Sequence, residues 1–133
     1  MARLEITRDL SATPERVWHA LTDPAALAAW FWPHLDNTVE TDPRVGGRYR
    51  IAGPRAGIAV TGEYLEVDPP RRLVFTWRWE DQDEQSRVTV ELRPAGTGTT
   101  LTLVHDRIGD AVTRDRFADG WRDCLDRLAT LPL

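Results

Sequence analysis

The amino-acid sequence predicts an α+β fold, in which a curved antiparallel sheet of about seven strands lies against one long C-terminal helix. Two short helices are expected after the first strand. Short segments of alternating apolar and polar residues, separated by turn residues, fill the middle of the chain, and one long helical pattern ends it. Short turns favour an antiparallel meander. Helices kept apart from the strands indicate α+β rather than repeated βαβ units.

The N-terminal third contains one strand and two short helices. Apolar residues alternate with polar ones over residues 4–10, which is typical of a half-buried strand. Thr13 followed by Pro14 forms a helix start, because threonine caps well and proline fits the first helical position. Residues 22–24, Thr-Asp-Pro, end this helix and cap a second one. The aromatic segment 31–33 ends the second helix.

From residue 36 the pattern changes to about six strands. Gly62 interrupts one of them and predicts a bulge or a close approach of the backbone to a neighbour. A sheet of this size twists, and one of its faces is expected to be apolar. The clearest alternating segments are residues 45–51, 58–67, 73–79, 88–92 and 101–105.

The last helix is predicted from about Thr113 to Leu131, with Asp110 as its N-terminal cap and Pro132 after its end. Its apolar residues recur at helical spacing and form one stripe that would lie on the sheet. If the sheet curves further than the helix fills, a cavity remains between them. The stripe consists of Phe117, Trp121, Cys124, Leu125 and Leu128.

Composition limits the functional classes. The 133 residues suit one domain covering residues 1–133, and the formal charge of −4 argues against nucleic acid as the main partner. The single cysteine makes no intrachain disulfide, and the charged N-terminus shows neither a signal peptide nor a membrane span. The sequence therefore predicts a soluble cytoplasmic protein.

Six short motifs follow one another along the chain: ATPERVW (12–18), LTDP (21–24), VGGRY (45–49), GEYLEV (62–67), PRRLVFTW (70–77) and GW (120–121). In this order they resemble the bacterial single-domain branch of the activator-of-heat-shock-chaperone-ATPase-like (AHSA1-like) proteins, which belong to the START/SRPBCC superfamily. This superfamily shares its helix-grip fold with the birch pollen allergen. The resemblance implies a seven-stranded antiparallel sheet around a long C-terminal helix, with a hydrophobic ligand cavity between them.

Aromatic and histidine side chains are the candidate ligand-binding residues. Apolar walls with a few polar groups are typical of small-molecule sites, although aromatic residues at strand and helix spacing also form ordinary cores. The predicted set is Trp30, Trp32, His34, Tyr49, Tyr64, Trp77, Trp79, His105, Phe117 and Trp121.

Two candidates have competing interpretations. His105 alternates with buried leucines, so it is either a structural histidine or a general base that faces a ligand. Arg8 occupies an inward position of the first strand, where it either pairs with an anionic group or, in the favoured interpretation, turns to solvent at a bulge. The histidines are too scattered for a metal site, and a thiol at Cys124 on the apolar stripe would stay protonated. No cofactor is expected.

The leading functional hypothesis is binding of a small aromatic, acyl or lipid-like molecule under the last helix. The second is an enzyme of the polyketide cyclase, aromatase or hydrolase type, in which His105 or a glutamate such as Glu63 or Glu66 would act on a bound carbonyl. The third is an adaptor that interacts with a chaperone through the exposed face of the sheet. A homodimer formed through an edge strand is a further possibility.

Overall fold

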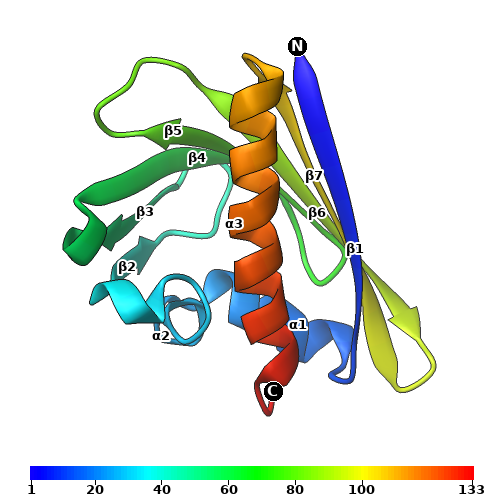
Figure 1. Ribbon diagram of the computed structural model, residues 1–133. Helices are drawn as coiled ribbons and strands as arrows, with labels where there is room; N and C mark the ends of the chain where they lie inside the picture. The colour runs from blue at the N-terminus through cyan, green and yellow to red at the C-terminus, as the bar shows by residue number, and fades with distance from the viewer.

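The structure is a computed structural model that describes residues 1–133, and it confirms the α+β architecture. Seven antiparallel strands form one curved sheet in the order β1-β7-β6-β5-β4-β3-β2, and the helix α3 crosses its concave side (Figure 1). The strands are β1 (Ala2–Leu10), β2 (Thr38–Thr41), β3 (Arg48–Gly53), β4 (Ile58–Asp68), β5 (Arg72–Trp79), β6 (Ser86–Ala95) and β7 (Gly98–Ile108).

The sheet is a meander from β2 to β7, and β1 pairs with the last strand rather than with its neighbour in sequence. Leu4 lies opposite His105, and Ile6 lies opposite Leu103. All four side chains are buried on the face that α3 covers. The first and last strands together therefore form the part of the sheet on which the C-terminal helix packs.

The predicted helix starts near the N-terminus are confirmed. The Thr13 hydroxyl accepts a hydrogen bond from the backbone N–H of Arg16 at the start of α1 (Pro14–Thr22). The Asp23 carboxylate accepts a hydrogen bond from the backbone N–H of Ala26 at the start of α2 (Pro24–Ala28). Two short 3₁₀ turns follow at η1 (Pro33–Leu35) and η2 (Pro54–Ala56).

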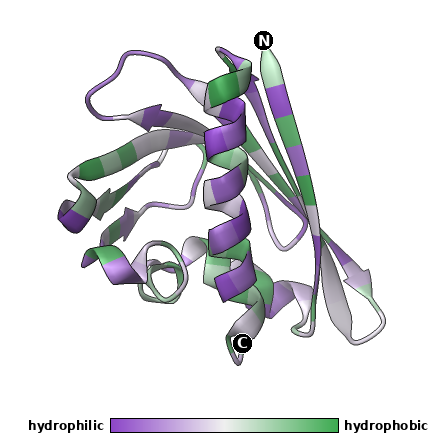
Figure 2. Cartoon of the chain, in the orientation of Figure 1, coloured by the Kyte–Doolittle hydropathy of each residue, from purple (hydrophilic) through white to green (hydrophobic).

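Helix α3 spans Ala111–Thr130, so it begins two residues before the predicted start and ends one residue before the predicted end. Asp110 is its N-terminal cap and accepts from the backbone N–H of Thr113 at 2.7 Å. The outward face of α3 is hydrophilic in Figure 2, and its buried residues are Ala118, Trp121, Cys124, Leu125 and Leu128. No helix combines the length and the apolar character needed to cross a bilayer.

The close approach predicted at Gly62 is confirmed. A Cβ atom added there would overlap the carbonyl oxygen of Thr76 on β5, and it would lie 2.6 Å from Cε1 of Tyr49. Gly120 in α3 is the opposite case, because a Cβ atom added there meets no atom within 4 Å. Glycine is thus required by packing in β4 and not in α3.

Substitution of these two glycines by alanine is expected to have opposite effects. Gly62→Ala should lower the free energy of unfolding by about 2–3 kcal/mol, because the β4–β5 pair must separate to admit the methyl group. Gly120→Ala should raise it by about 1 kcal/mol, because alanine is the better helix former. Urea denaturation of both variants measures the difference. Equal stability of the two variants would contradict this account.

The interpretation favoured for Arg8 is wrong. The irregularity in β1 lies between Ala2 and Leu4, so Arg8 keeps its inward position in the regular part of the strand. Its guanidinium donates to the carboxylate of Asp126 on α3 at 3.3 Å, and its side chain is 29% exposed. Because α3 passes over β1 at this point, a charged partner is available on the covered side, and no bulge is needed.

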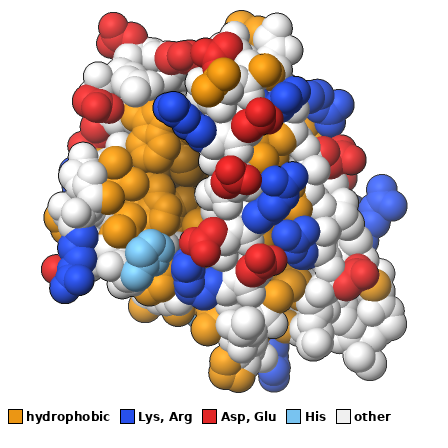
Figure 3. All heavy atoms as spheres, in the orientation of Figure 1, with side chains coloured by type: hydrophobic (Ala, Val, Ile, Leu, Met, Phe, Trp, Pro, Cys, Tyr) orange, Lys and Arg blue, Asp and Glu red, His pale blue; other side chains and the backbone are white.

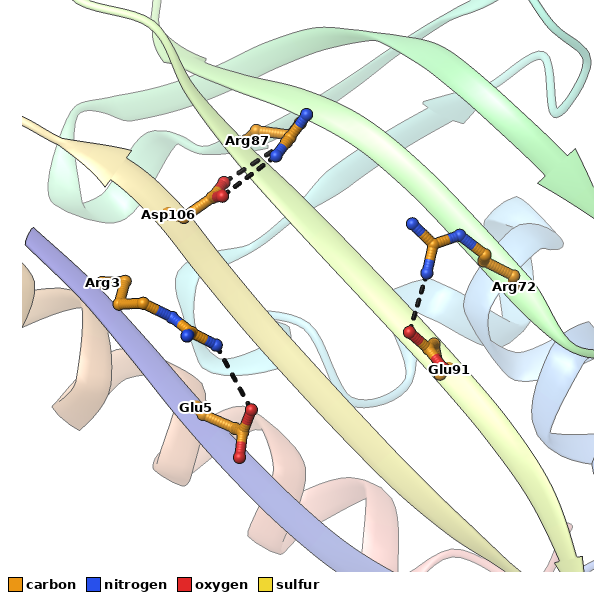
Figure 4. Close-up of polar contacts among 6 residues, drawn as sticks. All are labelled: Arg3, Glu5, Arg72, Arg87, Glu91 and Asp106. Atoms are coloured by element: carbon orange, nitrogen blue, oxygen red, sulfur yellow. Dashed lines mark hydrogen bonds and ion pairs between the residues drawn. The ribbon is translucent and has the colours of Figure 1, made fainter.

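The convex face of the sheet carries charged residues paired across strands. Arg87 on β6 pairs with Asp106 on β7 at 3.0 Å, and Arg72 on β5 pairs with Glu91 on β6 at 2.7 Å (Figure 4). Such cross-strand pairs lie over the backbone of the sheet and keep its outer face polar. The outer face of β5, β6 and β7 is therefore polar where these pairs lie.

Candidate functional site

An open cleft of about 350 Å³ lies beside the N-terminal half of α3. Figure 3 shows it as a hollow in which hydrophobic side chains gather next to the helix. The segment after α2, the end of β5 and the loop that follows β5 form the other walls. The lining residues are Phe31, Trp32, Ile58, Trp77, Trp79, Gln82, Thr113, Arg116, Phe117, Gly120, Trp121 and Cys124.

Aromatic rings in contact with one another make up most of the cleft wall. Trp32 and Trp79 are stacked with their ring centroids 5.9 Å apart and their planes at 6°. Trp77 lies 5.3 Å from Trp121, and Phe31 meets Trp121 edge to face at 5.6 Å. Rings held in such contacts lose little further freedom when a flat molecule packs on them. The cleft is therefore a preformed apolar site.

Helix α3 supplies one continuous face to the cleft. Its residues at the wall are spaced by three and four along the helix, which places them on one side. Gly120 lies in the middle of this face, in a helix interior where glycine costs about 1 kcal/mol relative to alanine. Its missing side chain leaves room in the cleft. The face consists of Thr113, Arg116, Phe117, Gly120, Trp121 and Cys124.

Trp32 reaches the cleft from a strained backbone position. It has φ 57° and ψ 41°, in the left-handed region that large side chains rarely adopt. Trp32 is the residue at which η1 starts, and its indole ring stacks on Trp79. Strained backbone positions of this kind are concentrated at binding sites, where the surrounding structure holds them.

The polar groups of the cleft wall are few. Arg116 is the one charged residue among the lining side chains, and it makes no ion pair or hydrogen bond. Gln82 and Thr113 add an amide and a hydroxyl group. The indole Nε1–H of Trp77 is buried without any hydrogen-bond partner. A buried donor that lacks an acceptor is costly and uncommon in folded proteins.

A second, inner cavity lies between α3 and the sheet, and it is nearly filled. Its volume is about 40 Å³, and all fifteen lining residues are hydrophobic. A space of this size and polarity holds no organic ligand, since small-molecule sites measure about 300–1,000 Å³. The space available for a ligand therefore lies beside α3 and not directly beneath it.

Eight of the ten predicted ligand-binding residues line one or both of these spaces. Trp32, Trp79 and Phe117 line the open cleft. Trp30, Tyr49 and Tyr64 line the inner cavity. Trp77 and Trp121 line both spaces. His34 is exposed in η1, and neither it nor the buried His105 lines either space.

His105 is held from both sides behind the cleft wall. Its Nδ1 accepts a hydrogen bond from Nε1 of Trp121 at 3.0 Å, and its Nε2 lies 2.7 Å from the hydroxyl of Ser86. Because the Trp121 indole can only donate, Nδ1 carries no proton, and Nε2–H donates to Ser86. Phe117 stacks on the imidazole at 4.6 Å. Burial lowers the pKa of His105 to about 3, so the ring is neutral and fully bonded. It has no free lone pair with which to act as a base.

The other titratable groups near the cleft are also unsuited to acid–base work. Burial raises the pKa of the Cys124 thiol to about 12, which keeps it protonated. Burial likewise raises the pKa of Tyr49, whose hydroxyl donates to the carbonyl oxygen of Thr76 at 2.6 Å. Glu63 and Glu66, offered above as catalytic carboxylates, do not line the cleft. No three His, Cys, Asp or Glu side chains lie together as a metal site would require.

Sequence reasoning missed several lining residues, notably Phe31, Gln82, Arg116 and Gly120. The signal for two of them was present in the last helix. Arg116 and Gly120 lie at the same three-and-four spacing as Phe117 and Trp121, beside the apolar stripe. An arginine and a helix-interior glycine next to large rings indicate a surface that is not packed against the sheet.

Comparison with known proteins gives a consistent result. A family profile described as "Activator of Hsp90 ATPase homolog 1-like protein" matches residues 11–131. No curated protein matches the sequence significantly. Among solved structures, protein CV1439 from Chromobacterium violaceum is 34% identical with a TM-score of 0.82, covering 96% of this chain and 94% of that one.

Two further structures extend this picture. CalU16 from Micromonospora echinospora is 31% identical with a TM-score of 0.77, covering 95% of this chain and 73% of that one. PFC0360w, an HSP90 activator from Plasmodium falciparum, is 27% identical with a TM-score of 0.79, covering 96% of this chain and 94% of that one. The fold, the sequence match over residues 11–131 and these structural relatives show that the chain belongs to the Activator of Hsp90 ATPase homolog 1-like family.

Proposed function

We propose that the protein binds a small hydrophobic molecule in the cleft beside α3. The observation that carries this proposal is the open, aromatic-walled space of about 350 Å³, which falls in the size range of small-molecule sites. Rings such as Trp32 and Trp79 offer flat faces that suit a planar aromatic or acyl ligand.

Gly120 supports the same proposal. Neither a turn nor close packing requires glycine there, since an added Cβ atom meets nothing within 4 Å. A helix under selection for stability alone would carry alanine at this position. A role in keeping the ligand cleft wide would explain why this position carries glycine despite the loss of helix stability.

The test is a binding measurement with prodan, a neutral naphthalene dye whose fluorescence rises in apolar surroundings. Wild type is expected to bind it with micromolar affinity. Gly120→Leu, which places a side chain in the cleft, should weaken binding at least about tenfold while the helix gains stability. Gly120→Ala is the matched control, because a methyl group fills little of the cleft.

Two results would overturn the proposal. One is the absence of prodan binding by wild type, and the other is unchanged binding by Gly120→Leu. Because Gly120→Leu is expected to be at least as stable as wild type, lost binding cannot be ascribed to unfolding. Thermal unfolding of each variant, measured without dye, checks this point.

A second candidate function is interaction with a heat-shock chaperone, favoured by the similarity to PFC0360w, which is described as an HSP90 activator. Its test is the ATPase rate of purified Hsp90 with and without an excess of this protein. A rise in rate would support the interaction. An unchanged rate, together with no complex in analytical ultracentrifugation, would reject it.

A further inference from the structure

The cleft wall carries one positive charge and no negative charge, and a purely apolar ligand would make no contact with that charge. Arg116 is the one charged side chain among its twelve lining residues, and no aspartate or glutamate lines it. Elsewhere in the molecule most arginines are neutralised, as Arg114 is by Asp115 and Arg122 by Asp119 on the same helix. Arg116 makes no ion pair, although Asp110 at the start of the same helix is close enough to feel its charge and the chain as a whole carries a net charge of −4.

The remaining polar groups of the cleft wall add only donors or neutral groups. The Trp77 indole Nε1–H has no hydrogen-bond partner, but its nitrogen has almost no accessible surface and is therefore closed off from the open space of the cleft. The Thr113 hydroxyl and the Gln82 amide make no side-chain hydrogen bond within the protein, so both are free to donate. The cleft therefore presents one guanidinium that makes no ion pair, and no carboxylate competes for it.

Resting on the proposed function, we propose that the ligand is a planar aromatic carboxylate. Its rings lie against the aromatic wall, and its carboxylate binds Arg116. A guanidinium forms two parallel hydrogen bonds with a carboxylate and is weakly hydrated, so it suits this role at the edge of an apolar site. The aromatic wall supplies most of the affinity, and Arg116 selects the anion.

The deciding experiment compares two isosteric probes, 2-naphthoate and 2-naphthamide, by isothermal titration calorimetry. They share one ring system and differ in charge. Wild type is expected to bind the carboxylate about five- to tenfold more tightly than the amide, and added salt should narrow the difference. Arg116→Gln should abolish the preference and leave the affinity for 2-naphthamide unchanged.

Arg122→Gln is the matched control, because it removes the same charge from the same helix at a residue that does not line the cleft. It should keep the preference for the carboxylate. If wild type binds both probes equally, or if Arg122→Gln loses the preference as fully as Arg116→Gln, this inference fails while the proposed function stands. If neither probe binds at millimolar concentration and prodan also fails, both fail.

Discussion

Replacing Trp121 by alanine is expected to lower the free energy of unfolding by about 3–5 kcal/mol. The indole is 5% exposed and packs against Phe31 and Trp77, so its removal leaves a large void. It also deprives Nδ1 of His105 of its only donor. Because Trp121 lines both the open cleft and the inner cavity, the two spaces would join.

Trp121→Phe separates the contribution of the packed ring from that of the indole N–H. It keeps an aromatic ring but removes the N–H, so a loss of about 1–3 kcal/mol is expected from the unsatisfied imidazole nitrogen and the smaller volume. Urea denaturation of both variants gives the values. A loss below about 1 kcal/mol for Trp121→Ala would show that the helix does not depend on this anchor.

The second large effect is acid destabilisation through His105. Burial lowers the pKa of this residue from 6.5 to about 3 in the folded protein, so the unfolded chain binds a proton that the folded protein does not. Stability linked to His105 is therefore complete above pH 6.5 and declines as the pH falls toward 3. Between pH 7 and pH 5 the free energy of unfolding should fall by about 2 kcal/mol.

The comparison that isolates this effect uses His105→Gln, whose side-chain oxygen can still accept from Trp121 and whose charge does not change with pH. The variant should show a nearly flat stability profile from pH 7 to pH 5. His34→Gln, in the exposed η1 turn, should keep the wild-type slope. The carboxyl groups whose pKa values are lowered, Glu80 and Asp110, titrate below this window. A slope that survives in His105→Gln would place the titrating group elsewhere.

The secondary structure was largely predictable because its signals are local. The caps at Thr13, Asp23 and Asp110 are single polar side chains next to the helices they start, and each makes the expected hydrogen bond. The close approach at Gly62 was marked by the glycine itself. Arg8 was assigned incorrectly because its partner, Asp126, is distant in the sequence and is brought near only by the crossing of α3 over β1.

The candidate site was predictable in composition but not in arrangement. The aromatic residues could be named from their spacing, yet nothing in the sequence indicated that Trp30, Tyr49 and Tyr64 line a nearly filled interior while Trp32 and Trp79 wall an open cleft. That division depends on how far the sheet curves and on the left-handed backbone at Trp32. Both are set by packing between elements that are distant along the chain.

By itself the sequence determined which segments are strands and helices, which of their faces are apolar and which family the chain resembles, because periodicity and capping act over a few residues. Only the tertiary structure decided that β1 pairs with β7, that both nitrogens of His105 are used, and that Arg116 and the Trp77 indole share one cleft. The physical reason is that a cleft is the volume left unfilled when several surfaces meet. That volume depends on the relative placement of those surfaces, which no local pattern records.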